Sequence, residues 1–230
     1  MTGQQTESAK GLINDRTNRL ANAIRHRILN GEFAPGQRLI EADLCSEFNA
    51  SRRQVREALA SLAHEGLVQI VANRGARVRI VKLDEALQLA EARFALERLC
   101  IERAAKHIKE KETGELQLLA QSLRTAVDSG DVFLFRRSAA SLQACIVAIA
   151  DQPVVSELLQ RLRDRSAWMR NRLTFQPGWP QASLPYRLKL IDALCRRDGH
   201  AAVEAQRGHY QLWCDTMRRM ANSATDETVQ

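Results

Sequence analysis

The chain has 230 residues, of which 27% are charged and 45% hydrophobic, and its net charge is +7. Such a composition is typical of globular proteins with room for two modest domains, and it argues against a disordered or membrane-embedded chain. The positive charge favours a polyanionic partner such as nucleic acid.

The cysteines and the amino-terminal residues indicate the cellular compartment. The cysteines are widely spaced and include no C-x-x-C pair, which predicts buried thiols in a reducing compartment: Cys45, Cys100, Cys145, Cys195 and Cys214. The first residues, MTGQQTESAK, lack a hydrophobic segment, so we expect no signal peptide. No apolar run is expected to approach the length of a membrane span. We therefore expect a cytoplasmic protein.

The first third of the chain predicts three short helices. Residues 1–14 are polar and are expected to be disordered. A first helix is predicted over 17–30, and Pro35-Gly36 should form a turn before a short helix over 41–48. Ser51 is a good N-cap for a third helix, and Gln54 can close a capping box with it. That helix should end at Gly66.

The third helix has two different faces. Its apolar residues recur at helical spacing and should face a core: Val55, Ala58, Leu59 and Leu62. Arg52, Arg53 and Arg56 lie outside that stripe, at the start of the helix. Such a basic helix start suits an element that enters a DNA major groove by its amino-terminal end. The alternative is a solvated amphipathic helix whose charges serve solubility.

A β-hairpin is predicted to follow, with strands over 67–71 and 76–81. Asn73-Arg74-Gly75 should form the turn, Val78 and Ile80 should point to one face, and Arg77 and Arg79 to the other. Packed on three helices, the hairpin completes a winged helix-turn-helix domain over 15–81. The alternative is a hairpin whose charges only protect its edge.

These residues resemble a known family. The motifs are I-x2-G-x3-P-G-x2-L-x-E-x2-L from Ile28 to Leu44, S-R-x2-V-R-E-A-L-x2-L-x2-E-G-L-V over residues 51–68, and R-G-x2-V from Arg74 to Val78. They resemble the amino-terminal domain of GntR-type bacterial transcription regulators. One departure is Gln54, which stands where the family usually has proline; glutamine is compatible with the helix.

The resemblance implies a set of DNA contacts. Arg52 and Arg56 are expected to contact the operator, the Arg74-Gly75 wing to reach a neighbouring groove, and Arg38 to lie near the phosphate backbone. The complete candidate DNA-binding set is Arg38, Ser51, Arg52, Arg53, Gln54, Arg56, Arg74, Gly75 and Arg77.

The rest of the chain shows only helical periodicity. Six helices are predicted, over 84–109, 113–128, 131–150, 153–171, 184–196 and 199–220, with Asp84, Thr113 and Asp131 at helix starts. The Pro/Gly-rich stretch over 174–185 is expected to be a long loop, and residues 222–230 a disordered tail. The fold is therefore predicted to be mostly α, with an antiparallel six-helix bundle over 84–221 and a central cavity.

This second half resembles the FCD-type carboxy-terminal domain of the FadR subfamily. The motifs are R-x2-L-E from Arg93 to Glu97, I-D-A-L-x2-R-D-x2-A-A over residues 191–202, and the late His209. The resemblance implies an effector-binding and dimerisation domain. In many members a divalent metal is held by D-x3-H on one helix and by a histidine on each of two later helices.

The metal-binding positions are mostly lost in this sequence. They fall at Ala139, Gln143, Arg187 and His209, so only His209 retains a ligand. Ala139 cannot bind a metal and Arg187 would repel a cation, so we predict no metal cofactor. The alternative is a metal-dependent sensor, if this register is misread.

The residues left inside the bundle suggest an anion instead. Arg93, Gln143, Arg187 and His209 form the candidate effector-binding set, because a buried guanidinium suits a carboxylate or phosphate. Internal pairing is the alternative: Arg93 with Glu97, or Arg187 with Glu97 or Asp192. His209 could equally be a core histidine.

The sequence therefore predicts a homodimeric, ligand-responsive DNA-binding regulator with a pseudo-palindromic operator. The alternative is a DNA-binding architectural protein that no longer senses an effector. An enzyme is disfavoured, because the sequence has no nucleophile elbow, phosphate loop, Rossmann fingerprint or metal dyad.

Overall fold

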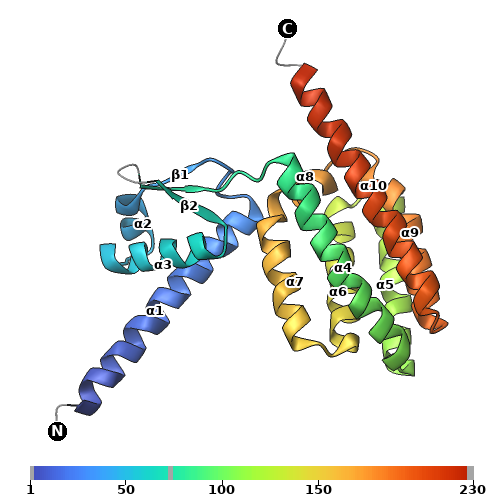
Figure 1. Ribbon diagram of the computed structural model, residues 1–230, viewed down its shortest axis with the longest axis horizontal. Helices are drawn as coiled ribbons and strands as arrows, with labels where there is room; N and C mark the ends of the chain where they lie inside the picture. The colour runs from blue at the N-terminus through green and yellow to red at the C-terminus, as the bar shows by residue number, and fades with distance from the viewer. Residues whose placement is uncertain (1–2, 72–74, 227–230) are drawn as a thin grey trace. The chain divides into compact units, whose positions relative to one another are not determined.

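The computed structural model describes residues 3–71 and 75–226. The chain divides into two compact units, Met1–Val81 and Lys82–Gln230 (Figure 1). Each unit has its own core and is described by itself below.

The first unit is a winged helix-turn-helix. Its elements in chain order are α1 (Gly3–Asn30), β1 (Arg38–Leu39), α2 (Glu41–Glu47), α3 (Arg52–His64), β2 (Val68–Val71) and β3 (Gly75–Val78). The strands form an antiparallel sheet in the order β1-β3-β2. The apolar stripe predicted for α3 is buried in the core, together with Ile24 of α1 and Leu44 of α2.

Local signals in the sequence set the two ends of α3. Gly66 has a φ of 78°, in the left-handed region that glycine adopts without strain, and follows the last turn of α3. Leu67 N–H donates to the Leu62 carbonyl over 3.0 Å, which closes the helix end. The predicted stop at Gly66 is therefore confirmed.

Three expectations for this unit were wrong. The first helix begins at Gly3, well before residue 17, so the segment expected to be disordered is helical; its Gln, Glu, Ala and Lys residues favour helix and it lacks proline. The hairpin is part of a three-stranded sheet, because Arg38 and Leu39 pair with Arg77 and Ala76. A strand of two residues carries no periodicity to detect. Ile80 lies beyond the end of β3 and is 59% exposed.

The second unit is entirely helical in the part that the structure describes. Its elements are α4 (Leu83–His107), α5 (Glu110–Asp128), α6 (Val132–Ala150), α7 (Pro153–Arg165), α8 (Ala167–Thr174), α9 (Trp179–Cys195) and α10 (Gly199–Asp226). The long helices α4 and α10 run side by side, and α10 also packs on α9 (Figure 1). The mostly α fold is confirmed, with seven helices in this unit where six were predicted.

The extra helix comes from a break at Ser166. The predicted helix over 153–171 is split into α7 and α8, and the Ser166 hydroxyl donates to the Leu162 carbonyl over 2.9 Å. A serine that bonds backbone groups locally competes with helix propagation.

The Pro/Gly-rich stretch is mostly helix rather than loop. Gly178 adopts a left-handed φ of 79° before α9, and Pro180 sits in the first helical turn, where proline removes no helical hydrogen bond. Pro185 is tolerated inside α9. The tail expected to be disordered from 222 is helical as far as Asp226.

Other helix starts also differ in part from the prediction. Asp131 caps α6, since its side chain accepts from Leu134 N–H over 2.8 Å, as predicted. Asp84 lies in the first turn of α4 instead of capping it. Thr113 lies inside α5, which begins at Glu110.

Helix α6 is long and apolar enough to cross a membrane by length and composition alone, contrary to the expectation that no segment approaches a span. Core helices of bundles pass the same test. In this fold α6 packs against α4 and α5 and buries Phe135, Leu142 and Ile146.

Candidate functional site

The start of α3 has the geometry predicted for a recognition helix. Ser51 N–H donates to Gln54 Oε1 over 2.9 Å, and Gln54 N–H donates to Ser51 Oγ over 3.3 Å. This reciprocal pair is the predicted capping box. The capping box satisfies the first backbone donors of the helix and fixes the direction in which its arginines leave the backbone.

The three arginines of α3 are all exposed, but they differ in their partners. Arg56 Nε lies 2.9 Å from Glu41 Oε2, on the preceding helix α2. Arg53 Nε lies 2.8 Å from Glu57 Oε1, one turn along α3. Arg52 forms no ion pair with any residue that the structure describes. Exposed ion pairs of this kind are weak, so DNA phosphates can compete for these groups.

The exposed face of the sheet carries a second basic group. Arg38 and Arg77 are directly opposite each other on β1 and β3, and Arg77 is opposite Gln69 on β2. Arg77 Nη2 donates to Gln69 Oε1 over 2.8 Å, which holds its guanidinium across the sheet. Like charges placed opposite each other repel, so this pair favours an anion between or above them.

The wing tip is only partly described. Arg74 lies outside the described residues, so its predicted DNA contact stays a prediction. Gly75 has a φ of 81°, which the hairpin turn requires and which suits glycine.

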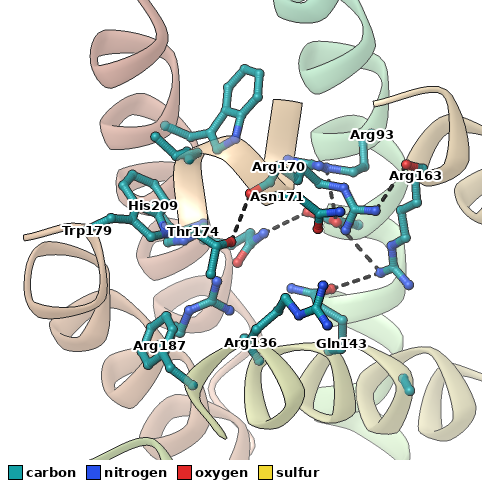
Figure 2. Close-up of a pocket in the computed structure, with 18 of the residues that line it drawn as sticks. Arg93, Arg136, Gln143, Arg163, Arg170, Asn171, Thr174, Trp179, Arg187 and His209 are labelled. Carbon is teal, nitrogen blue, oxygen red and sulfur yellow. Dashed lines mark hydrogen bonds and ion pairs between the residues drawn. The ribbon is translucent and has the colours of Figure 1, made fainter. Parts of the chain in front are cut away.

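The helical unit encloses a cavity of about 370 Å³. All four residues predicted for effector binding line it: Arg93 from α4, Gln143 from α6, Arg187 from α9 and His209 from α10 (Figure 2). Three further arginines line it too: Arg136, Arg163 and Arg170. The structure therefore brings the predicted set together and adds positive charge to it.

The carboxylate of Glu97 interacts with several of the side chains that line the cavity. Glu97 Oε1 lies 3.4 Å from Arg93 Nε and 3.7 Å from Arg163 Nη2, and Gln206 Nε2 donates to Glu97 Oε2 over 2.6 Å. The internal pairing considered for Arg93 is thus present. Glu97 is the sole acidic residue lining the cavity, among the residues the structure describes.

Arg187 has no such carboxylate partner. Its guanidinium carbon lies 5.5 Å from the centre of the Phe135 ring, and its Nε is buried without a hydrogen-bond acceptor. No ion pair joins it to Glu97 or to Asp192, which instead lies 3.0 Å from Arg196. The internal pairing considered for Arg187 is therefore not found within the ranges 3–71 and 75–226.

Burial weakens proton binding by these arginines. Loss of hydration lowers the pKa of Arg170 to about 9, and the nearby positive charges of Arg93 and Arg163 add to the effect. Loss of hydration likewise lowers the pKa of Arg187 to about 10, although Glu97 acts in the opposite direction. Both side chains stay charged at neutral pH, so the cavity is strongly cationic.

His209 is held in its neutral form. Burial lowers its pKa well below the usual value, and Arg187 and Arg93 lower it further. Its ring packs edge-on against Trp179 with 5.7 Å between centroids, while Nε2 is unpaired. A neutral imidazole can donate to or accept from a ligand without adding to the positive charge.

The cavity does not fit the metal that the FadR resemblance implies. Ala139, Gln143, Arg187 and His209 all line it, so the register used to locate these positions is consistent with the fold. The structure contains no group of three or more His, Cys, Asp or Glu side chains that could hold a metal, within the described ranges. A guanidinium among the ligands would repel a divalent cation.

Sequence reasoning missed several cavity residues. Arg163 of α7 and Arg170 of α8 were not assigned to the cavity, although two residues seven apart lie on the same face even of a continuous helix. Trp213 also lines the cavity and is only 3% exposed. Trp213 is four residues from His209 on the same helix, and this spacing predicts that both side chains lie on one helix face.

A winged helix-turn-helix with a basic recognition helix, followed by a helical unit with a charged cavity, defines a DNA-binding transcription regulator. Residues 16–78 match the gntR family of bacterial regulatory proteins, and residues 88–212 match the FCD domain. The chain belongs to the GntR family of bacterial regulatory proteins and carries an FCD domain. The resemblance to GntR-type regulators with an FCD domain is therefore confirmed.

Relatives extend over most of the chain. It is 27% identical over 203 residues to the HTH-type transcriptional repressor RspR of Escherichia coli, covering 88% of this chain and 89% of RspR. It is 29% identical over 207 residues to the repressor NanR of Citrobacter rodentium, covering 81% and 79%. These relatives are transcription regulators.

Solved structures agree on the fold. E. coli McbR/YncC matches with a TM-score of 0.75 and 20% identity, covering 90% of this chain and 98% of that one. A putative GntR regulator from Rhodococcus matches with a TM-score of 0.72 and 21% identity, covering 88% and 97%.

Proposed function

We propose that this protein is a cytoplasmic, homodimeric regulator of the FadR type whose operator affinity is controlled by a small organic anion bound in the bundle cavity, without a metal. The observation that carries the proposal is the cavity's charge. Arg93, Arg163, Arg170 and Arg187 line it with one carboxylate, Glu97, among them.

Buried charge of one sign is costly unless a counter-ion accompanies it. Five of the cavity residues are arginines, and a guanidinium recognises carboxylate or phosphate through paired hydrogen bonds. The cavity is also of a size suited to a small molecule. An organic anion satisfies the charge and the hydrogen bonding of this site together.

The arginine at the third metal position supports the metal-free part of the proposal. Arg187 occupies a position at which many FadR-type proteins have a histidine, and it brings a fixed positive charge to that point. We infer that the guanidinium supplies positive charge for binding an anion at that point.

The proposed dimer and the proposed form of the operator both follow from the way helix-turn-helix domains bind DNA. Paired helix-turn-helix heads contact two half-sites about one helical turn apart, so the operator should be a short pseudo-palindrome. The relatives RspR and NanR are named repressors. An effector that favours one arrangement of the two heads would shift operator affinity by its preference for that arrangement.

The proposal is tested with the full chain and an operator selected from random duplex DNA. Operator affinity should change several-fold when organic acids are added, and the change should persist in the presence of a metal chelator. An effect that requires zinc and disappears with the chelator would instead support a metal-dependent sensor. Operator binding that no organic acid alters would favour the effector-independent architectural protein.

A further inference from the structure

The cavity contains many hydrogen-bond donors. Buried side-chain nitrogens with neither a hydrogen bond nor an ion pair gather there: Arg170 Nε, Arg187 Nε, His209 Nε2 and Trp213 Nε1. The arginine and tryptophan atoms can only donate. Because buried polar groups in native proteins are nearly always paired, such a cluster indicates a ligand that supplies acceptors.

Two acceptor side chains of the cavity are already engaged. Glu97 Oε2 accepts from Gln206, and Glu97 Oε1 lies near Arg93 and Arg163. Gln143 Oε1 accepts from Arg163 Nη2 over 3.1 Å. Glu97 and Gln143 therefore offer little further capacity to the unpaired donors.

The charge excess sets a lower limit on the ligand's own charge. Arg93 and Arg163 are largely buried, with side chains 11% and 16% exposed, and Arg170 and Arg187 are sufficiently desolvated that their pKa values are lowered. Two carboxylates, Glu97 and Asp164, act on this group of four guanidinium ions. A ligand with a single negative charge would therefore still leave one buried positive charge uncompensated.

The guanidinium groups are also spread across the cavity. Figure 2 shows Arg187 and His209 on one side and Arg163 on the opposite side, with Arg170 between them in the view. Arg187 extends from α9 and Arg163 from α7. One carboxylate is too small to satisfy donors at both ends, whereas a ligand with two anionic ends can reach both.

We propose that the effector carries at least two anionic groups, one bound by Arg187 and His209 and the other by Arg163 and Arg170, with Trp213 Nε1 donating to one of its oxygens. This inference rests on the proposed function, since it specifies the effector of the same site. Two carboxylates, or a carboxylate and a phosphate ester, share the chemistry that the site recognises.

Matched ligand pairs test the requirement for two charges. Isothermal titration of the full-length protein compares the dicarboxylates from malonate to adipate with monocarboxylates of equal carbon number, and 3-phosphoglycerate with glycerol 3-phosphate. At least one ligand with two anionic groups should bind with a Kd lower than that of its partner by about tenfold or more. The dicarboxylate and phosphate arms distinguish the two sources of charge.

The possible failures are distinguishable. Equal affinity for monocarboxylates and dicarboxylates would overturn the inference and leave the proposed anionic effector intact. Absence of binding across the whole panel to millimolar concentration, with operator binding retained, would overturn both.

Two variants locate the contacts, and a third is their control. Arg187→Met and Trp213→Phe should each weaken binding of the preferred dianion by about tenfold, because each removes a donor and keeps most of the side-chain volume. Arg172→Met removes an exposed arginine of α8 that stacks on Trp168 outside the cavity, so it should leave affinity unchanged. Wild-type affinity in both Arg187→Met and Trp213→Phe would overturn the assigned contacts, and circular dichroism establishes that each variant is folded.

Discussion

Arg56 of α3 is held by Glu41 of α2, with 2.9 Å between Nε and Oε2, so a side chain expected to read DNA bases is positioned in the free protein by the helix before the turn. Glu41 thus links the two helices of the helix-turn-helix through side chains as well as through the shared core. The pair is exposed, and Arg56 remains 69% accessible to a partner.

Replacing Arg56 by alanine should remove most of the discrimination between operator and random DNA. Loss of a base-contacting arginine costs about 1–3 kcal/mol at its base pair. Glu41→Gln should have a smaller effect in the same direction, because it frees Arg56 without removing it. Fluorescence anisotropy with operator and scrambled duplexes measures both. The control is Arg98→Ala, which removes an exposed, ion-paired arginine from the helical unit; unchanged specificity in Arg56→Ala would refute the recognition-helix assignment.

Arg77→Ala should weaken DNA binding in a different way. Its guanidinium lies on the exposed sheet face opposite Arg38, a place suited to a phosphate. Affinity for operator and for random DNA should fall together, and the slope of log affinity against log salt concentration should decrease by about one. Titrations at several salt concentrations check this. A selective loss for the operator would mean that Arg77 reads bases.

Arg187→Met should stabilise the ligand-free protein at neutral pH. The pKa of Arg187 is lowered to about 10 in the folded state, well below the ordinary value of a guanidinium, so the folded state binds this proton less tightly than the unfolded state does. The resulting penalty is fully present below pH 10 and fades as the pH rises towards the ordinary pKa of arginine. We expect a gain on the order of 1 kcal/mol near neutral pH.

Urea unfolding at neutral pH and above pH 10 measures that gain and its decrease. The Arg172→Met variant is again the matched control, and it should show no comparable pH-dependent gain. A loss of stability in Arg187→Met at neutral pH would show that this guanidinium makes a net stabilising interaction in the ligand-free protein.

The loss of the metal site should be reversible by substitution. Ala139 and Gln143 lie one helical turn apart on α6 and line the cavity with Arg187 and His209. The triple variant Ala139→Asp, Gln143→His, Arg187→His should therefore bind zinc and gain thermal stability from it, whereas the wild type should not. Thermal unfolding with zinc and with chelator tests this. Zinc stabilisation of the wild type at micromolar levels would contradict the proposed metal-free site.

Local signals accounted for much of the DNA-binding unit before the structure was known. Ser51 and Gln54 cap the start of α3, and Gly66 ends it, through contacts with backbone only a few residues away. Such local effects can be predicted from the sequence. The two-residue strand β1 could not be predicted from the sequence, because its pairing with β3 depends on the tertiary fold. The helical extension before residue 17 lies in a polar segment, and polarity alone does not distinguish a solvated helix from disorder.

The residues that line the cavity were predicted only in part. Arg93, Gln143, Arg187 and His209 line it as placed by resemblance, so family register gave the correct facing. Arg163 and Arg170 were missed because the prediction followed the metal positions of the family, and neither residue occupies one of them. Whether any of these residues binds an effector stays a prediction.

Arg170 has a second connection, to the backbone. Its Nη2 donates over 3.0 Å to the carbonyl of Arg163 in the last turn of α7, while its Nε is unpaired in the cavity. Carbonyls in a last helical turn lack partners within their own helix, so Arg170 closes the end of α7. An anion that draws Arg170 inward would therefore alter the fraying of that helix end, and amide hydrogen exchange around residues 163–170 would then report cavity occupancy.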